Sequence, residues 1–132
     1  MLRNGSLVAA GTVSNSYVIV YKAVDASLER YNQVGDTLRG NDSFGESVSL
    51  SSDGRMLAVG APFDDDGCYD WGKVFIFYMG NDSKYLLIGG YSGEADFDKF
   101  GWSVSMSGDG MRFAAGAPRN NGSGVSGGHV RV

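Results

Sequence analysis

Polar and apolar side chains alternate in several short stretches of the chain, most clearly over residues 47–51, where serine alternates with valine and leucine. A period of two is typical of a β-strand, because successive side chains of a strand point to opposite faces of a sheet. Asp53-Gly54 then supplies a turn signal, since these two residues tolerate positive φ at low cost. The apolar residues 56–61 predict the return strand of a hairpin, which Pro62 ends because it has no N–H to donate.

This hairpin belongs to a unit that occurs twice. Residues 44–62 return as residues 100–118 without a gap, with every landmark 56 positions further on. A fixed period of this size is typical of units that bury their apolar surface against copies of themselves, as in solenoids and propellers. Residues 4–11 match residues 53–60, so the chain opens inside a further copy, at the turn before its second strand.

The alternation and the repeat together predict ten strands in groups of three, four and three. They lie within residues 4–11, 16–21 and 31–35, then at 48–51, 56–61, 73–78 and 85–88, and finally at 104–107, 112–117 and 129–132. We align residues 16–21 with residues 73–78 and expect both faces of the apolar centre, residues 17–20, to be covered. Residues 22–30 form a polar connection, in which a helix over residues 23–28 would be too short to be stable alone.

The spacing of the landmarks resembles the FG-GAP repeat of the β-propellers of integrin α-subunit type, and the resemblance covers nearly the whole chain. The two landmark pairs are Phe44-Gly45 with Gly60-Ala61-Pro62, and Phe100-Gly101 with Gly116-Ala117-Pro118; Gly72-Lys73-Val74 and Gly128-His129-Val130 follow at equal distances. The resemblance implies an all-β fold built from antiparallel four-stranded blades.

We expect residues 1–37 to form a partial blade, residues 38–90 a complete blade and residues 91–132 a second partial blade. A propeller ring needs at least about four blades, so this chain cannot close a ring alone. It is then either part of a longer propeller or a piece whose copies complete one another's blades. In both cases the flanks leave apolar area in water if the chain stands alone, which predicts self-association. The flanking side chains concerned are Tyr17, Phe75, Phe77 and Phe113.

The amino-acid composition limits the functional classes to which this chain can belong. The chain has 132 residues, of which 42% are hydrophobic, and its 21 Gly and 2 Pro suit a folded domain with many tight turns. A formal charge of −4 with scattered Lys and Arg excludes a nucleic-acid partner. The longest apolar run is too short to insert into a membrane.

Residues 1–5 lack the apolar stretch of a secretory signal, so the chain is either cytosolic or lacks its true start. The resemblance instead implies an extracellular or cell-surface location, as part of a longer protein. Cys68 is the single cysteine, which rules out a disulfide within the chain. We expect it to be a partly buried free thiol.

Integrin-like FG-GAP repeats often hold calcium in the loop before the GAP strand, and the resemblance transfers that site to two sets of positions. They are Ser49, Ser51, Asp53 and Leu57 in one unit, and Ser105, Ser107, Asp109 and Phe113 in the next. Calcium needs several oxygen ligands, and each set contains one carboxylate and one apolar side chain. We therefore interpret both loops as plain Asp-Gly hairpins.

Acidic side chains also cluster after the GAP strand, at Asp64, Asp65, Asp66 and Asp70. A cation would relieve the repulsion between them, so a weak calcium site is one interpretation and a solvated acidic turn is the other. The corresponding residues 119–124 contain no carboxylate. The same two interpretations apply to a further acidic stretch, made of Glu94, Asp96 and Asp98. We expect no other cofactor.

Four asparagines begin an Asn-x-Ser triplet: Asn4, Asn41, Asn81 and Asn121. They are candidates for glycosylation in a secreted protein. The alternative, which we weigh equally, is that they are ordinary turn residues, because Asn, Asp, Gly and Ser are common in turns. Trp71 and Trp102 lie beside glycines at strand entries, where rim or inter-blade packing is expected, although an exposed Trp beside acidic groups could stack on a sugar. His129 is expected at the surface.

The function that this pattern favours is a non-catalytic binding or adhesion module. Between the repeats, residues 63–71 and 119–127 differ most while the strands stay alike, and loops on a rigid frame commonly carry recognition. The partner would be a protein, a glycan or further propeller blades. The alternatives are an accessory propeller of a larger extracellular hydrolase and a purely structural piece. One His and one Cys, with no nucleophile, base and orienting group at useful spacing, argue against an active site in this chain.

Overall fold

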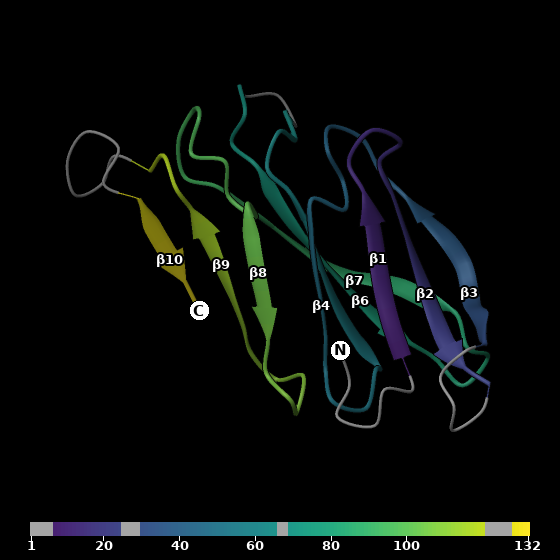
Figure 1. Ribbon diagram of the computed structural model, residues 1–132. Helices are drawn as coiled ribbons and strands as arrows, with labels where there is room; N and C mark the ends of the chain where they lie inside the picture. The colour runs from purple at the N-terminus through teal and green to yellow at the C-terminus, as the bar shows by residue number, and fades with distance from the viewer. Residues whose placement is uncertain (1–6, 25–29, 66–68, 121–127) are drawn as a thin grey trace.

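The structure is a computed structural model, which describes residues 7–24, 30–65, 69–120 and 128–132. Its regular structure in those residues is β-strand in three sheets (Figure 1). The first sheet consists of β1 (Leu7–Thr12), β2 (Tyr17–Ala23) and β3 (Tyr31–Arg39); the second of β4 (Ser47–Leu50), β5 (Met56–Ala61), β6 (Lys73–Met79) and β7 (Tyr85–Ser92); the third of β8 (Ser103–Met106), β9 (Phe113–Ala117) and β10 (His129–Arg131). The predicted grouping of three, four and three strands is confirmed for these residues.

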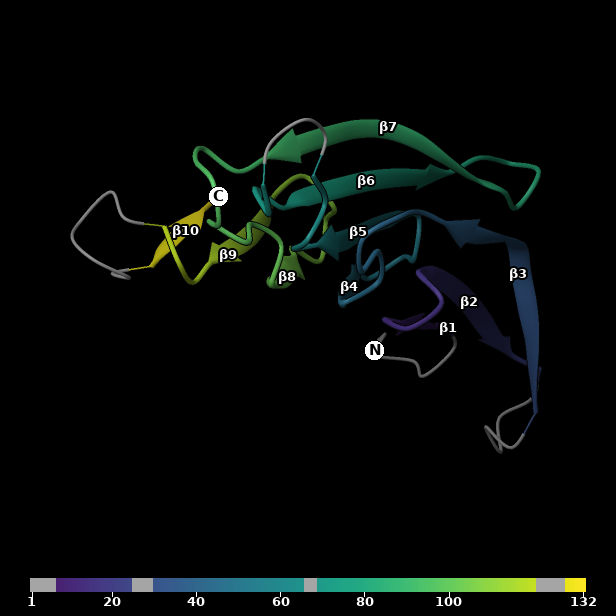
Figure 2. The ribbon, with the colours of Figure 1, turned by 90° about the horizontal axis from the view of Figure 1, so that it is seen from above.

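Each sheet is an antiparallel meander, in which strands that follow one another in sequence are paired. Ser47 of β4 pairs with Gly60 of β5, and Ser103 of β8 pairs with Gly116 of β9, so the second and third sheets share one register. Figure 2 shows the three sheets fanning out from the place where β1, β4 and β8 lie near one another. The sheets are blades of a propeller whose ring is not closed, and we call them the first, middle and third blade.

Side chains on opposite faces of the middle blade belong to two separate hydrophobic cores. The core shared with the first blade contains Leu7, Val18, Val20, Phe44, Leu57, Val59, Ala61, Phe77 and Tyr85. The core shared with the third blade contains Ala58, Val74, Ile76, Phe100, Met106, Ala115 and Ala117. Alternate residues of β5 and β6 therefore point into different cores, as the period of two requires.

The first blade corrects two expectations about β2. Val18 and Val20 are buried, whereas Tyr17 and Ile19 are half-buried, so only one face of residues 17–20 is fully covered. The alignment of residues 16–21 with residues 73–78 is also wrong by one position, because Thr12 pairs with Tyr17 where Ala61 pairs with Lys73. A shift of one residue exchanges the two faces of a strand. The shorter connection between β1 and β2 produced this error in the alignment.

The repeated Phe-Gly and Gly-Ala-Pro landmarks meet in space. Gly45 has a φ of +97°, and its N–H donates to the carbonyl of Gly60 at 3.0 Å within the middle blade. Gly60 in turn lies against Gly101, the matching glycine of the third blade, so closely that a Cβ at Gly60 would come 2.0 Å from the Gly101 carbonyl oxygen. A side chain at this position would therefore push the two blades apart.

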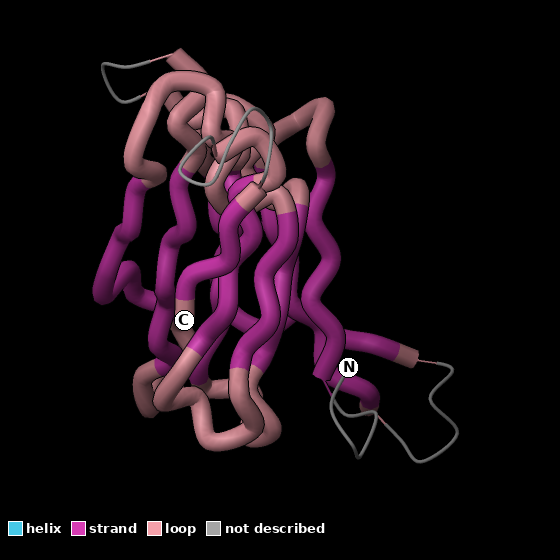
Figure 3. Tube along the Cα trace, turned by 90° about the vertical axis from the view of Figure 1, so that its left-hand side faces the viewer, coloured by secondary structure: helices cyan, strands magenta, loops and turns pink. Residues whose placement is uncertain are grey.

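Loops and turns gather at the two ends of the strands (Figure 3). We call the end that carries residues 13–16, 40–46, 62–65, 69–72, 93–102 and 118–120 the loop end. The opposite end carries the hairpins of β4–β5, β6–β7 and β8–β9. The predicted blade limits, residues 1–37, 38–90 and 91–132, stay predictions, and residues 25–29, where a short helix was considered, lie outside the described residues.

Candidate functional site

The side chain of Asp53 accepts hydrogen bonds from residues of its own hairpin, the one between β4 and β5. Its Oδ1 accepts hydrogen bonds from the Ser51 hydroxyl at 2.6 Å and from the Arg55 N–H at 2.9 Å, and both bonds lower the pKa of the Asp53 carboxyl. The prediction of a two-residue Asp-Gly turn is wrong. The loop is longer, because the Ser51 N–H donates to the Met56 carbonyl across it, and of Asp53 and Gly54 only Gly54 has a positive φ, +71°. The side chains of Ser51 and Asp53 hold the backbone in this longer turn.

The next hairpin repeats this arrangement around Asp109. Its Oδ1 accepts from the Ser107 hydroxyl at 2.6 Å and from the Met111 N–H at 2.9 Å, and the pKa of Asp109 is lowered by these bonds. Leu57, at the last position of the transferred calcium set, is fully buried in the core. Ser49, at the first, accepts a hydrogen bond from the Met106 N–H of the third blade at 2.9 Å. These positions therefore serve the turns and the packing of the blades.

The acidic residues after the GAP strand are partly described. The Oδ1 of Asp65 accepts a hydrogen bond from the Asp70 N–H at 2.8 Å, and the Asp64 carbonyl accepts one from the Gly72 N–H at 3.3 Å. Within residues 7–24, 30–65, 69–120 and 128–132, no three His, Cys, Asp or Glu side chains group as a metal site would need. Because Asp66 lies outside those ranges, calcium at Asp64, Asp65, Asp66 and Asp70 stays a prediction.

In the acidic stretch before the third blade, the expectation of a solvated turn is wrong at Asp98, and calcium there stays a prediction. This side chain is only 1% exposed, and its Oδ2 accepts hydrogen bonds from the Glu94 and Ala95 N–H groups and from the Asn120 Nδ2, each at 2.9 Å. Asp96 accepts from the Trp71 Nε1 at 2.7 Å. These carboxylates fix the loop between β7 and β8 and tie it to its neighbours.

Two loops at the loop end, the one before β6 and the one before β8, are joined by backbone hydrogen bonds like those between paired strands. The N–H groups of Phe97, Lys99 and Phe100 donate to the carbonyls of Tyr69, Asp70 and Trp71 at 2.8, 3.1 and 3.0 Å respectively. Phe97 and Lys99 have φ values of +66° and +55°, and Asp70 has +48°. Positive φ at side chains of this size costs energy and persists only where the surroundings impose it.

This arrangement presents a group of exposed aromatic rings. Phe63 and Trp102 meet edge to face with centroids 6.1 Å apart, and the Lys99 Nζ lies over the Phe63 ring at 4.2 Å. Tyr69 and Phe97 stack with centroids 6.3 Å apart and planes at 11°. Tyr69 is 71% exposed, Phe97 51% and Trp102 45%. We call Phe63, Tyr69, Phe97, Lys99 and Trp102 the aromatic surface.

The two tryptophans differ in their surroundings. Trp71 is half-buried and donates a hydrogen bond to Asp96, whereas Trp102 is exposed and packs edge to face on Phe63, which follows β5 of the middle blade. Sequence reasoning missed Phe63, Tyr69, Phe97 and Lys99, because they come from two loops with no shared spacing. The signal available was the local frequency of aromatic residues between strands.

Other candidate residues are spread over the molecule. Asn41 and Asn81 are exposed, in turns at opposite ends of the blades, so their glycosylation stays a prediction. His129 is exposed at the start of β10, as expected. Asn4, Asn121 and Cys68 lie outside the described residues.

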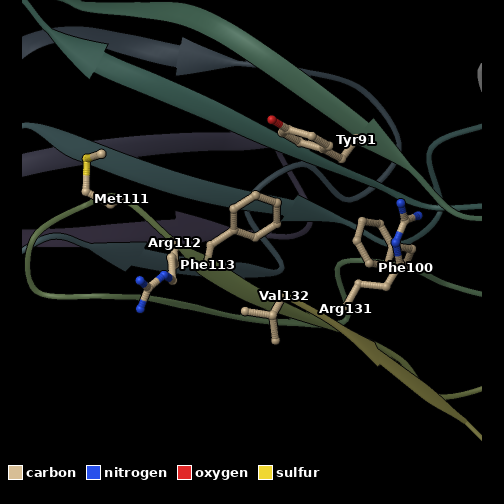
Figure 4. Close-up of a pocket in the computed structure, with 7 residues that line it drawn as sticks. All are labelled: Tyr91, Phe100, Met111, Arg112, Phe113, Arg131 and Val132. Atoms are coloured by element: carbon tan, nitrogen blue, oxygen red, sulfur yellow. The ribbon is translucent and has the colours of Figure 1, made fainter.

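A cavity of about 560 Å³ opens between β7 and the third blade (Figure 4). It is lined by Tyr91, Phe100, Met111, Arg112, Phe113, Arg131 and Val132. In Figure 4 the ring of Phe113 from β9 lies below the ring of Tyr91 from β7, and their centroids are 5.2 Å apart.

The family model of the FG-GAP repeat matches residues 37–77, which include all of β4 and β5. Residues 37–77 are an FG-GAP repeat. No curated protein matches the chain. The Phe44-Gly45 and Gly60-Ala61-Pro62 landmarks of this FG-GAP repeat return in the third blade in the same register. The FG-GAP repeat is a propeller repeat, in agreement with the blades observed, and such repeats typically occur in extracellular proteins. Among the described residues, no helix has the length and apolar character needed to cross a lipid bilayer.

Proposed function

We propose that this chain is a non-catalytic binding module that recognises a protein partner outside the cell through the aromatic surface at its loop end. The observation that carries the proposal is the exposure of Tyr69, Phe97 and Trp102 on loops that are bonded to each other. Tyr and Trp are enriched at the energetic centres of protein interfaces, because they offer large contact area at low entropic cost.

The surroundings of these rings favour a partner with basic groups. Asp65, Asp70, Glu94 and Asp96 lie on the same two loops, and the formal charge of the chain is −4. Complementary charge at the rim of an interface speeds encounter and selects among partners. Lys99, which contacts two of the aromatic rings, would fix their positions and leave the acidic rim to face the partner.

The preformed backbone supports recognition at this place. The two loops already hold positive φ values at Phe97 and Lys99, and backbone strain of this kind often occurs at binding sites. A surface that is ordered before binding loses less conformational entropy on association.

The test compares a loop variant with a matched control on an array of purified extracellular matrix proteins. The loop variant is Tyr69→Ser with Phe97→Ser and Trp102→Ser. The control, Leu86→Ser with Leu87→Ser and Ile88→Ser, replaces three side chains of β7 that are exposed to a similar degree. We expect the loop variant to lose at least roughly tenfold in affinity for the proteins that the natural chain retains, as hot-spot residues do. Equal retention of both variants would refute the proposal.

A glycan is the second candidate partner, because exposed aromatic rings beside carboxylates could also stack on a sugar. A glycan array probed with the same two variants separates the candidates. Binding to glycans alone that requires Tyr69, Phe97 and Trp102 would assign the surface to sugars, and binding to proteins alone would assign it to a protein partner.

A further inference from the structure

Tyr69 is the most exposed tyrosine of the chain. All seven tyrosines lie in the described residues, and Tyr69 is 71% exposed, against 48% for Tyr91, the next of them. The Tyr91 ring packs on Phe113 at the cavity, whereas the Tyr69 ring stacks on Phe97 at the loop end. The phenol of Tyr69 is therefore the one that a second enzyme can reach most easily in the folded chain.

Carboxylates flank this tyrosine in the sequence. Asp64 and Asp65 precede Tyr69 and Asp70 follows it directly, all within five positions, and Lys73 is the one basic residue in the same span. Asp65 and Asp70 are also held together, because the Oδ1 of Asp65 accepts a hydrogen bond from the Asp70 N–H at 2.8 Å. The exposed phenol therefore belongs to a segment of strongly negative charge.

A second loop brings a further acidic group to the same place. The N–H of Phe97 donates to the Tyr69 carbonyl at 2.8 Å, so the loop before β8 runs along the loop before β6. Asp96 comes directly before Phe97, and its carboxylate accepts a hydrogen bond from the Trp71 Nε1 at 2.7 Å. The folded chain thus carries carboxylates on both of the loops that meet at Tyr69.

An exposed phenol among carboxylates suits an enzyme that transfers sulfate. Such an enzyme holds an anionic phosphosulfate donor with basic side chains, so it binds an acceptor flanked by carboxylates more tightly than a neutral one. The phenolic oxygen attacks the sulfur of the donor, and a new O–S bond forms as the S–O bond to the phosphate breaks. The nucleoside phosphate leaves with the bridging oxygen, and the phenolic proton passes to a base of the enzyme.

We propose that Tyr69 is a site of O-sulfation, at which a second enzyme transfers the sulfuryl group of a nucleotide phosphosulfate to the phenolic oxygen. The inference rests on the proposed function, because tyrosine sulfation takes place in the secretory pathway and acts on proteins bound for the outside of the cell. Two features select the acceptor, the exposure of its ring in the folded chain and the carboxylates on either side of it, among them Asp65 and Asp70.

A sulfate ester at Tyr69 changes what the aromatic surface attracts. It adds a permanent negative charge and acceptor oxygens beside the stacked rings of Tyr69 and Phe97. Charge-assisted hydrogen bonds from Arg and Lys are about twice as strong as neutral ones. A basic partner then gains contacts at the centre of the aromatic surface as well as at its acidic rim, so the modification regulates the affinity of this surface.

The experiment incubates the purified 132-residue chain with a tyrosylprotein sulfotransferase and its radiolabelled nucleotide phosphosulfate donor. We expect the chain to be labelled, and mass spectrometry of its peptides to locate the sulfate at Tyr69. Tyr69→Phe keeps the ring that stacks on Phe97 but removes the acceptor oxygen, so the label should be lost. No labelling of the natural chain, or equal labelling of Tyr69→Phe, overturns the proposal.

A matched pair of variants tests the part played by the carboxylates. Asp65→Asn with Asp70→Asn removes two charges beside Tyr69 and keeps side-chain oxygens that accept hydrogen bonds. Asp36→Asn with Asp42→Asn makes the same change of charge at exposed positions of other segments. We expect the first pair alone to slow labelling, by about threefold or more. Equal rates for the two double variants would contradict selection by the local charge.

The sulfated and unsulfated chains are then compared on the array of extracellular matrix proteins. Tighter and more salt-sensitive binding by the sulfated chain is the expected result, and equal binding by the two forms contradicts the regulation. A chain that is sulfated at Tyr69 but binds no protein in either form supports the modification and contradicts the proposed function. Binding by a chain that the enzyme does not sulfate supports the proposed function and overturns the modification.

Discussion

Tyr85 joins the outer strand of the middle blade to the hairpin at its inner edge. Its ring is buried between two blades, and its hydroxyl donates to the Gly54 carbonyl. Burial, together with the negative charge of Asp53, raises the pKa of the Tyr85 hydroxyl to about 12. The folded state therefore holds the neutral phenol more strongly than the unfolded chain does.

We predict that this tyrosine makes the stability of the chain depend on alkaline pH. Because the pKa is raised in the folded state, the contribution of Tyr85 is complete below the unfolded value of about 10 and is lost as pH rises toward 12. Tyr85→Phe should cost about 1 kcal/mol near neutral pH and show a smaller alkaline loss. Urea unfolding at several pH values measures both, and an equal alkaline loss in the two proteins would contradict the prediction.

We also predict that substitution by alanine has different effects on stability at two glycines that occupy equivalent positions in the middle and third blades. Gly60→Ala would bring a Cβ 2.0 Å from a backbone oxygen of the next blade, so we expect a loss of about 1–3 kcal/mol or more. Gly116→Ala faces the open side of the third blade, where the nearest atom, at 2.7 Å, is the movable hydroxyl of Ser103. Thermal unfolding of the two variants should differ clearly, and equal losses would show that the blades do not pack at Gly60.

At the scale of elements, the β4–β5 and β8–β9 hairpins each contain a hydrogen-bonded aspartate whose protonation at acid pH lowers the stability of the fold. The pKa values of Asp53 and Asp109 are lowered by hydrogen bonds from a serine and a backbone N–H. A lowered pKa contributes stability above the unfolded value of about 4, and this contribution is lost as pH falls through the folded value.

We therefore predict that replacing both aspartates with asparagine flattens the acid side of the stability profile. Asparagine keeps an oxygen that can accept the same hydrogen bonds but does not titrate in this range. The denaturant midpoint of the natural chain should fall below about pH 4 more steeply than that of the Asp53→Asn, Asp109→Asn variant. Parallel curves for the two proteins would mean that other carboxyl groups govern the acid response.

The strands themselves were largely accessible to sequence reasoning. Residues 56–61 were predicted with their observed limits, because the apolar run is bounded by a turn signal and by Pro62. The register of β2 was not, since the apolar residues 17–20 fit either face and only the pairing of Thr12 with Tyr17 decides between them. The aromatic surface depends on hydrogen bonds between two loops, which no local pattern indicates.

At the scale of the whole molecule, the outer face of the first blade repeats a face that is buried elsewhere. Val8, Tyr21 and Tyr31 line a hollow of about 350 Å³. By strand register they are the counterparts of Leu57, Phe77 and Tyr85, all of which are buried between the first and middle blades. Tyr31 is 42% exposed where Tyr85 is 7% exposed. An apolar face of this kind favours association in water.

We infer that the apolar outer face of the first blade is covered by association in solution. The most direct test is the mass of the folded chain by light scattering over a range of concentrations, with circular dichroism to verify its β-structure. We predict a mass above the 14.0 kDa of one chain, reduced by Tyr21→Ser with Tyr31→Ser but not by Tyr69→Ser at the loop end. A folded monomer of 14.0 kDa at every concentration would contradict the claim.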